Sequence, residues 1–134
     1  MMKQKSHLTK KEYEVMKVLW NSEKPLLISD LLLMTENVAE NSLHPMVKSL
    51  LKKGYIKVVG NMKVAKTQSR FYAPALTVDE YAAIQLNEIF SAFDKKFNFS
   101  NFLAYFASHN KRKSNLIVAE LENFLDEYKK QDDN

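Results

Sequence analysis

A long basic stretch without any acid is the feature of this sequence that points most clearly to chemistry. No Asp or Glu occurs between Glu40 and Asp79, whereas seven Lys or Arg side chains fall in that interval. A solvated face is the plainer interpretation of any charge run, but a cationic stretch of this length favours a surface that meets a polyanion, nucleic acid above all. The cations are Lys48, Lys52, Lys53, Lys57, Lys63, Lys66 and Arg70.

The net charge of the 134 residues, +4, is unevenly divided along the chain. Residues 1–76 hold 13 Lys and Arg against 6 Asp and Glu, a net charge of +7. Residues 77–134 hold 7 against 10, a net charge of −3. This asymmetry predicts two tasks on one chain: a domain of residues 1–76 whose candidate partner is a polyanion, such as double-stranded DNA, and a second domain of residues 77–134.

Other kinds of chemistry lack the residues they need. The absence of cysteine excludes disulfides and thiolate metal clusters, and two glycines are too few for a phosphate-binding loop. His7 and His109 have no neighbours at metal-ligand spacing, and no Ser, His and carboxylate form a plausible nucleophilic set. We therefore expect no enzyme, no metal and no cofactor. The apolar runs are far shorter than the ~20 residues that span a bilayer, and none follows the basic start, so we expect a cytoplasmic protein without membrane insertion.

A capping box marks the first expected helix. Thr9 and Glu12 stand three residues apart, so the Thr9 hydroxyl can accept from the Glu12 backbone while the carboxylate reaches back. Apolar residues then recur at helical spacing, and Pro25 prevents any continuation. The sequence therefore predicts a helix over residues 10–21.

Two more helices are expected before the chain turns to strands. Residues 26–28 are a short apolar run that predicts a small strand, and Ser29 is then placed to cap a helix that reaches about Glu36. Within residues 42–53, apolar side chains follow the i, i+3, i+4, i+7 pattern of a helix with one buried stripe. Gly54 is suited to the left-handed residue that ends this helix.

The following segments have the composition of strands. Residues 55–59 and 70–73 are rich in aromatic and β-branched side chains, and the polar residues between them predict a hairpin with a long, basic tip. Helix, short strand, helix, helix and hairpin is the order of a winged helix-turn-helix. The expected fold class is therefore mostly α with a small β-hairpin, a winged helix followed by a C-terminal helical dimerisation region.

The third helix of a winged helix has a polar side narrow enough to enter the major groove of DNA. Residues near its N-terminal end reach base edges, and later cations lie on phosphates. For His44, a solvated surface position is the alternative to a contact with guanine or phosphate. The candidate DNA-binding residues are Asn41, Ser42, His44, Pro45, Lys48, Ser49, Lys52, Lys53, Lys57, Lys63, Lys66 and Arg70.

The C-terminal region is expected to be helical and aromatic. Thr77 and Glu80 form a second capping box, which begins a helix to about Phe93, and further helices are expected near residues 100–109 and over residues 115–129. A segment of this size is too small to bury so many rings alone, which favours an interface between two copies over a monomer core. The candidate dimerisation residues are Phe90, Phe93, Phe97, Phe102, Phe106, Ile117, Leu121, Phe124 and Leu125.

Three segments resemble the penicillinase-repressor family of winged-helix proteins. The sequence LTKKEYEVMKVLW at residues 8–20 looks like its opening helix, LLKKGY at residues 50–55 resembles the end of its recognition helix, and RFYAP at residues 70–74 is similar to the return strand of its wing. The resemblance covers nearly the full length. It implies a dimeric repressor that binds inverted repeats in bacterial promoters until a signal, from an upstream sensor or a protease, releases it.

The sequence departs from the family pattern at several places. Pro45 and Ser49 stand where the family usually has threonine and arginine, and the proline predicts a recognition helix that begins late or is distorted. The copper-sensing members end in paired CxC motifs, which a chain without cysteine cannot contain. Some members are cleaved at a C-terminal Asn–Phe bond; Asn101-Phe102 is such a pair, although the register of the final helix places Tyr105-Phe106 nearer that position. The hairpin is also longer than expected for the family.

The function predicted from these features is sequence-specific repression of transcription by a homodimer on an inverted-repeat operator. Pro45 favours an alternative, a winged helix used as a protein-interaction module, whereas the acid-free stretch argues against it. A third interpretation is a non-specific architectural DNA-binding protein.

Overall fold

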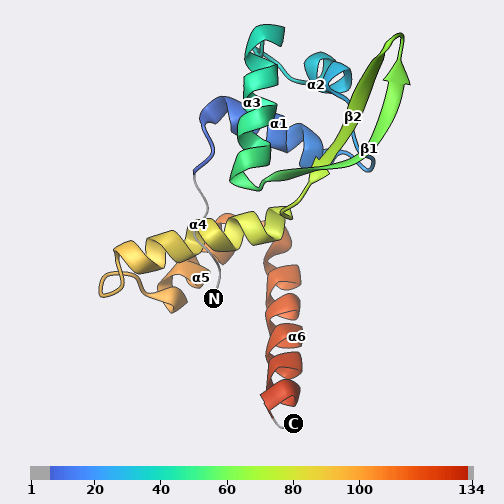
Figure 1. Cartoon of the computed structure of the whole chain (residues 1–134). Helices are drawn as coiled ribbons and strands as arrows, with labels where there is room; N and C mark the ends of the chain where they lie inside the picture. The colour runs from blue at the N-terminus through green and yellow to red at the C-terminus, as the bar shows by residue number, and fades with distance from the viewer. Residues whose placement is uncertain (1–6, 133–134) are drawn as a thin grey trace. The chain divides into compact units, whose positions relative to one another are not determined.

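The computed structural model describes residues 7–132, which divide into two compact units (Figure 1). The first unit ends at Glu88 and the second begins at Ile89, so the helix α4 (Val78–Ala92) contributes to both. None of the described helices is long and apolar enough to cross a membrane.

The first helix, α1 (Lys10–Asn21), has the predicted bounds and the predicted capping box. The Glu12 backbone N–H donates to Thr9 Oγ1 at 3.1 Å, and the Thr9 backbone N–H donates to Glu12 Oε1 at 2.8 Å. These two bonds satisfy N–H groups at the helix start that have no partner within the helix.

The expectations for residues 26–28 and Ser29 were wrong in detail. Leu26 forms only an isolated antiparallel bridge with Tyr72, and helix α2 (Ile28–Met34) already begins two residues later. Its N-cap is Leu27, whose backbone N–H donates to Asp30 Oδ2 at 2.9 Å. Ser29 is the second residue of the helix and therefore cannot be its N-cap. The helix also ends two residues before Glu36.

Helix α3 (Glu40–Lys53) begins two residues before the predicted range and contains Pro45 in its interior. The expected late start is therefore wrong. The Leu43 backbone N–H bonds to the Ala39 carbonyl at 3.0 Å, which forms the first turn before the proline is reached. Gly54 ends the helix in the left-handed conformation, at a φ of 83°, as predicted.

The hairpin consists of β1 (Ile56–Val64) and β2 (Thr67–Pro74), paired antiparallel. The long basic tip predicted from the sequence is mostly strand, because the pairing continues to Val64 opposite Thr67 and only two residues form the turn. Ala65 in that turn has a φ of 57°. The register shifts between Val58 and Gly60, so a bulge lets the ladder continue through a segment that lacks strand composition.

One hydrophobic core holds these elements together. It takes one buried stripe from each of the first three helices and the inner side chains of the hairpin, and the first half of α4 covers it. Tyr81 of α4 packs on Trp20, with 5.2 Å between ring centroids, and the Trp20 indole donates to the Leu76 carbonyl at 2.8 Å. The largest fully buried side chains are Tyr55, Met16, Leu19, Leu26, Leu31, Leu43, Leu50 and Val15.

The second unit contains the end of α4, α5 (Phe99–His109), a short 3-10 turn η1 (Lys111–Lys113) and α6 (Ser114–Asp132). Phenylalanine rings contact one another along the first part of this unit, from Phe90 against Phe97 at 4.4 Å to Phe102 against Phe106 at 5.9 Å. Within the part of the unit that the structure describes, no side chain is fully buried. The fold is thus mostly α with one hairpin, a winged helix followed by C-terminal helices, as predicted.

Candidate nucleic-acid interface

Helix α3 has a buried side and an exposed side. Leu43, Val47 and Leu50 face the core. The exposed side chains belong to Asn41, His44, Pro45, Lys48 and Lys52, and those of Ser42 and Ser49 are half-buried. The candidate residues therefore lie opposite the core stripe, which is the arrangement by which a recognition helix presents its polar side to the major groove.

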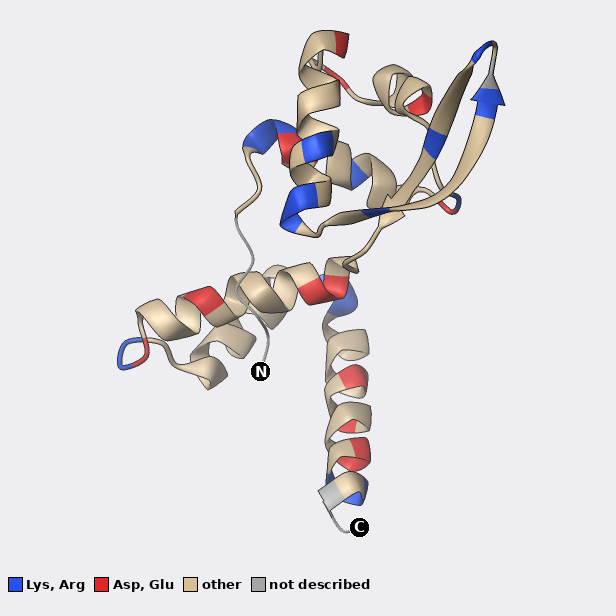
Figure 2. Ribbon diagram, viewed as in Figure 1, with Lys and Arg blue, Asp and Glu red and all other residues tan. Residues whose placement is uncertain are grey.

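The hairpin adds cations without any acid. The side chains of Lys57, Lys63, Lys66 and Arg70 are all exposed, and Figure 2 shows only Lys and Arg among the charged residues of β1 and β2. On α3 the only acid is Glu40, at the start of the helix. The exposed surface formed by α3 and the hairpin is therefore electropositive, which suits phosphate contacts.

An open pocket lies between the start of α3 and the hairpin. Glu40 and His44 line it from α3, and Arg70 lines it from β2. Its other polar lining residues are Ser29, Thr67, Gln68 and Ser69. Thr67, Gln68 and Ser69 were not singled out from the sequence because residues 60–69 were expected to form a loop, and Ser29 was expected only as a helix cap. Glu40 was not singled out because the helix was expected to begin later, although it is the acid at the edge of the acid-free stretch.

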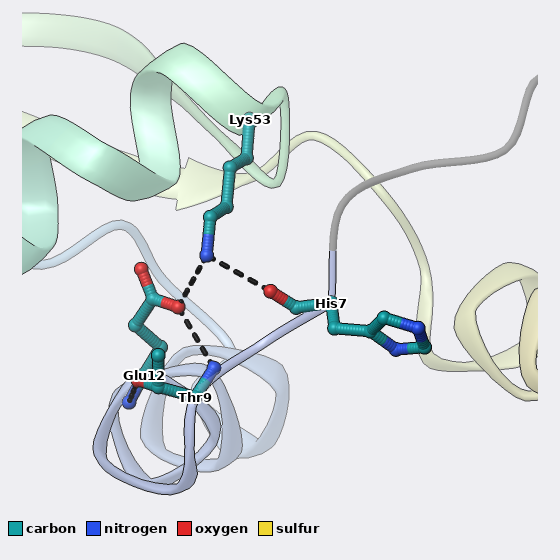
Figure 3. Close-up of polar contacts among 4 residues, drawn as sticks. All are labelled: His7, Thr9, Glu12 and Lys53. Atoms are coloured by element: carbon teal, nitrogen blue, oxygen red, sulfur yellow. Dashed lines mark hydrogen bonds and ion pairs between the residues drawn. The ribbon is translucent and has the colours of Figure 1, made fainter.

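Lys53 lies apart from the exposed face of α3. Its ammonium donates to Glu12 Oε1 at 2.6 Å and to the His7 carbonyl at 2.9 Å (Figure 3). The Lys53 side chain is 20% exposed and that of Glu12 only 3%. Lys53 therefore connects the end of α3 to the start of α1, whereas its neighbour Lys52 points into solvent.

The Glu12 carboxylate is held in its charged form by this arrangement. Burial raises its pKa, but hydrogen bonds from Lys53, from the Thr9 backbone and from Ser49, together with the charge of Lys53, outweigh burial and leave the pKa below its ordinary value. Ser49, one of the candidate DNA-binding residues, thus shares in the same cluster.

The candidate dimerisation residues fall into two groups. The side chains of Phe90, Phe97, Phe102 and Ile117 are half-buried within the second unit. Those of Phe93, Phe106, Leu121, Phe124 and Leu125 are exposed, with Phe124 at 61%. Tyr105 and Tyr128 are exposed beside them and were not singled out from the sequence. The Asn101-Phe102 bond lies in the first turn of α5.

A winged helix with a cationic face, on which Glu40 is the one acid, has the features of a class of DNA-binding proteins. Residues 8–127 match the penicillinase repressor family, and the chain belongs to that family. The family is one of DNA-binding transcriptional repressors rather than enzymes. No curated protein matches the chain. Within residues 7–132, no three His, Asp or Glu side chains come together in a way that could hold a metal ion.

Proposed function

We propose that this protein is a cytoplasmic repressor that binds an inverted-repeat operator as a homodimer. The observation that carries the proposal is the exposed face of α3 and the hairpin, on which every charged residue after Glu40 is a cation. Membership of the penicillinase repressor family supports the same function.

Within this proposal, the residues of the face divide into two tasks. Asn41, Ser42 and His44 lie in the first half of α3, where a recognition helix meets base edges. The side chains of Pro45 and Ser49 form part of the same surface of α3. The phosphate contacts are assigned to Lys48, Lys52, Lys57, Lys63, Lys66 and Arg70, all of which are exposed.

The exposed apolar surface of the second unit supports a homodimer. Every residue of α6 from Val118 to Gln131 is exposed in the single chain, including Leu121, Phe124 and Leu125. Most of the stability of a helix in a protein comes from packing of its apolar face rather than from helix propensity, so the exposed apolar side chains of α6 favour a partner surface. A second copy would bury these side chains and place two recognition helices about one helical turn apart, ~10 bp centre to centre.

Release from DNA is assigned to an upstream sensor or a protease, as the family resemblance implies. Asn101 is exposed and Phe102 packs on Phe97 and Phe106. A protease acting at this bond would have to open the start of α5, and cleavage would separate α6 from the DNA-binding unit.

The proposal is tested by selecting binding sites from a random duplex library with the purified full chain, at near-physiological salt and with excess competitor DNA. We expect an enriched inverted repeat whose half-sites are about 10 bp apart. Salt-labile binding without any enriched sequence would instead favour the architectural alternative. If the chain binds no duplex, a protein-interaction module becomes the favoured function.

A substitution of His44 tests the assignment of the recognition face. If His44 contacts a base, His44→Ala relaxes the preference at one position of each half-site by roughly 1–3 kcal/mol. The wild-type operator, mutated one base pair at a time, gives this measurement. An unchanged profile would place His44 in solvent.

A further inference from the structure

Glu40 is the only acid on the face that we assign to DNA. It is the first residue of α3, its side chain is exposed, and it lines the same pocket as His44 and Arg70. Among residues 7–132, no hydrogen bond or ion pair engages its carboxylate. A negative charge therefore stands open at the tip of the helix that would enter the groove.

A carboxylate in this position is repelled by phosphates, which carry the same charge. It can be accommodated only where DNA offers a hydrogen-bond donor, and in the major groove such donors are the amino groups of cytosine and adenine. Adenine presents the acceptor N7 beside its amino group, which repels a carboxylate. Cytosine has no major-groove acceptor on its own ring, so its N4 amino group is the donor that Glu40 fits best.

The spacing to His44 supports a role in base reading. Residues four apart on a helix are neighbours on one face, with about 6 Å between their Cβ atoms. Glu40 and His44 are therefore placed to meet adjacent base pairs, while the cations further along α3 and on the hairpin lie nearer the backbone.

We propose that Glu40 is a specificity-determining residue that selects a cytosine in each half-site by accepting a hydrogen bond from its N4 amino group. This inference rests on the proposed function. Glu40 also lowers the affinity for DNA sites without that cytosine. On such sites its charge faces phosphates and base acceptors with no compensating hydrogen bond.

Two substitutions test the inference, with site selection from a random duplex library as the readout. Glu40→Gln removes the charge and presents an amide, which pairs with adenine through N6 and N7. We expect the enriched base at one position of each half-site to change from cytosine to adenine. Glu40→Ala has neither the carboxylate nor an amide, and we expect the preference for cytosine at that position to fall about tenfold or more.

Affinity for duplexes that lack the operator gives an independent measurement. Both variants lose a charge that opposes phosphate, so their affinity for non-specific DNA rises about two- to fivefold at low salt. Damage to the fold would lower this affinity instead. Glu36→Gln is the matched control, because Glu36 is exposed on a different pocket, beside Glu14 and Lys17 of α1, and should change neither quantity.

The outcomes separate this inference from the proposed function. If the wild-type chain enriches no sequence, the proposed function fails. If it enriches an operator and both Glu40 variants enrich the same operator with the same base preferences, Glu40 contributes only to the start of the helix and the inference is overturned. A wild-type preference for a base other than cytosine at the position that responds to Glu40→Ala would also overturn it.

Discussion

Lys53, the last residue of α3, donates to Glu12 of α1 at 2.6 Å. The two residues are 41 positions apart in the sequence, and Glu12 also accepts from the backbone of Thr9. One carboxylate thus caps α1 and fixes the end of α3, so the two helices share a polar anchor beside the apolar core.

Loss of Lys53 should destabilise the protein. Lys53→Met keeps the length of the side chain but leaves the buried Glu12 carboxylate without its cation, and we expect the free energy of unfolding to fall by about 2 kcal/mol. Urea denaturation at pH 7 measures this change. Lys52→Met, at the exposed neighbouring position, should stay within about 0.5 kcal/mol of the wild type. Equal losses for the two variants would contradict the anchor.

The same anchor makes stability depend on pH. The pKa of Glu12 is lower in the folded chain than its ordinary value, because hydrogen bonds and the charge of Lys53 outweigh burial, so the unfolded chain binds the proton more tightly. The stabilisation is therefore present above the ordinary glutamate pKa of about 4.3 and is lost as the pH falls through the folded value.

Replacing Glu12 by Gln should remove this contribution. We expect the stability of Glu12→Gln to fall less steeply than that of the wild type between about pH 5 and pH 3, as measured by urea denaturation across that range. Glu23→Gln, on an exposed residue just after the same helix, is the control. Parallel curves for the wild type and Glu12→Gln would show that other carboxylates carry the acid sensitivity.

Local signals in the sequence were sufficient for much of this fold. The capping boxes at Thr9 and Thr77 and the left-handed Gly54 were all predicted, since each depends on residues within one turn. The cap of α2 was missed because Leu27 has no polar side chain and Asp30 supplies the bond instead.

Features that depend on distant contacts could not be predicted in the same way. The long hairpin requires the bulge between Val58 and Gly60 and also the positive φ of Ala65, a position where glycine or asparagine is usual. The contact of Lys53 with Glu12 joins residues 41 positions apart, so composition alone does not reveal it. Pro45 predicts a late helix start because it lacks an N–H. The first turn of α3, which begins at Ala39, forms before the proline is reached, so the missing N–H does not delay the helix.

Phosphate binding by the exposed lysines should be visible in the salt dependence of DNA affinity. Removing one lysine–phosphate ion pair lowers the slope of log K against log salt by about 0.9, so Lys48→Ala should lower it by about 1.8 when both subunits of a dimer bind. Fluorescence polarisation with a labelled operator at several salt concentrations gives the slope. Lys53→Met should leave the slope unchanged, because its ammonium is engaged by Glu12. A reduced slope for Lys53→Met would show that Lys53 also binds phosphate.

Pro45 should limit the stability of α3. At this position a residue with an N–H would donate to the carbonyl of Asn41, and proline cannot; an interior proline costs roughly 3 kcal/mol relative to alanine. Pro45 is exposed, so Pro45→Ala removes no core packing. We expect the free energy of unfolding to rise by at least about 1 kcal/mol, as measured by urea denaturation, with little change for His44→Ala at the exposed position before it. A loss of stability in Pro45→Ala would mean that the first turns of α3 are shaped to fit the proline.

Site selection with the same variant then shows whether the shape of these turns takes part in reading the operator. If it does, the enriched half-site changes. If it does not, the half-site is the same and only the affinity differs.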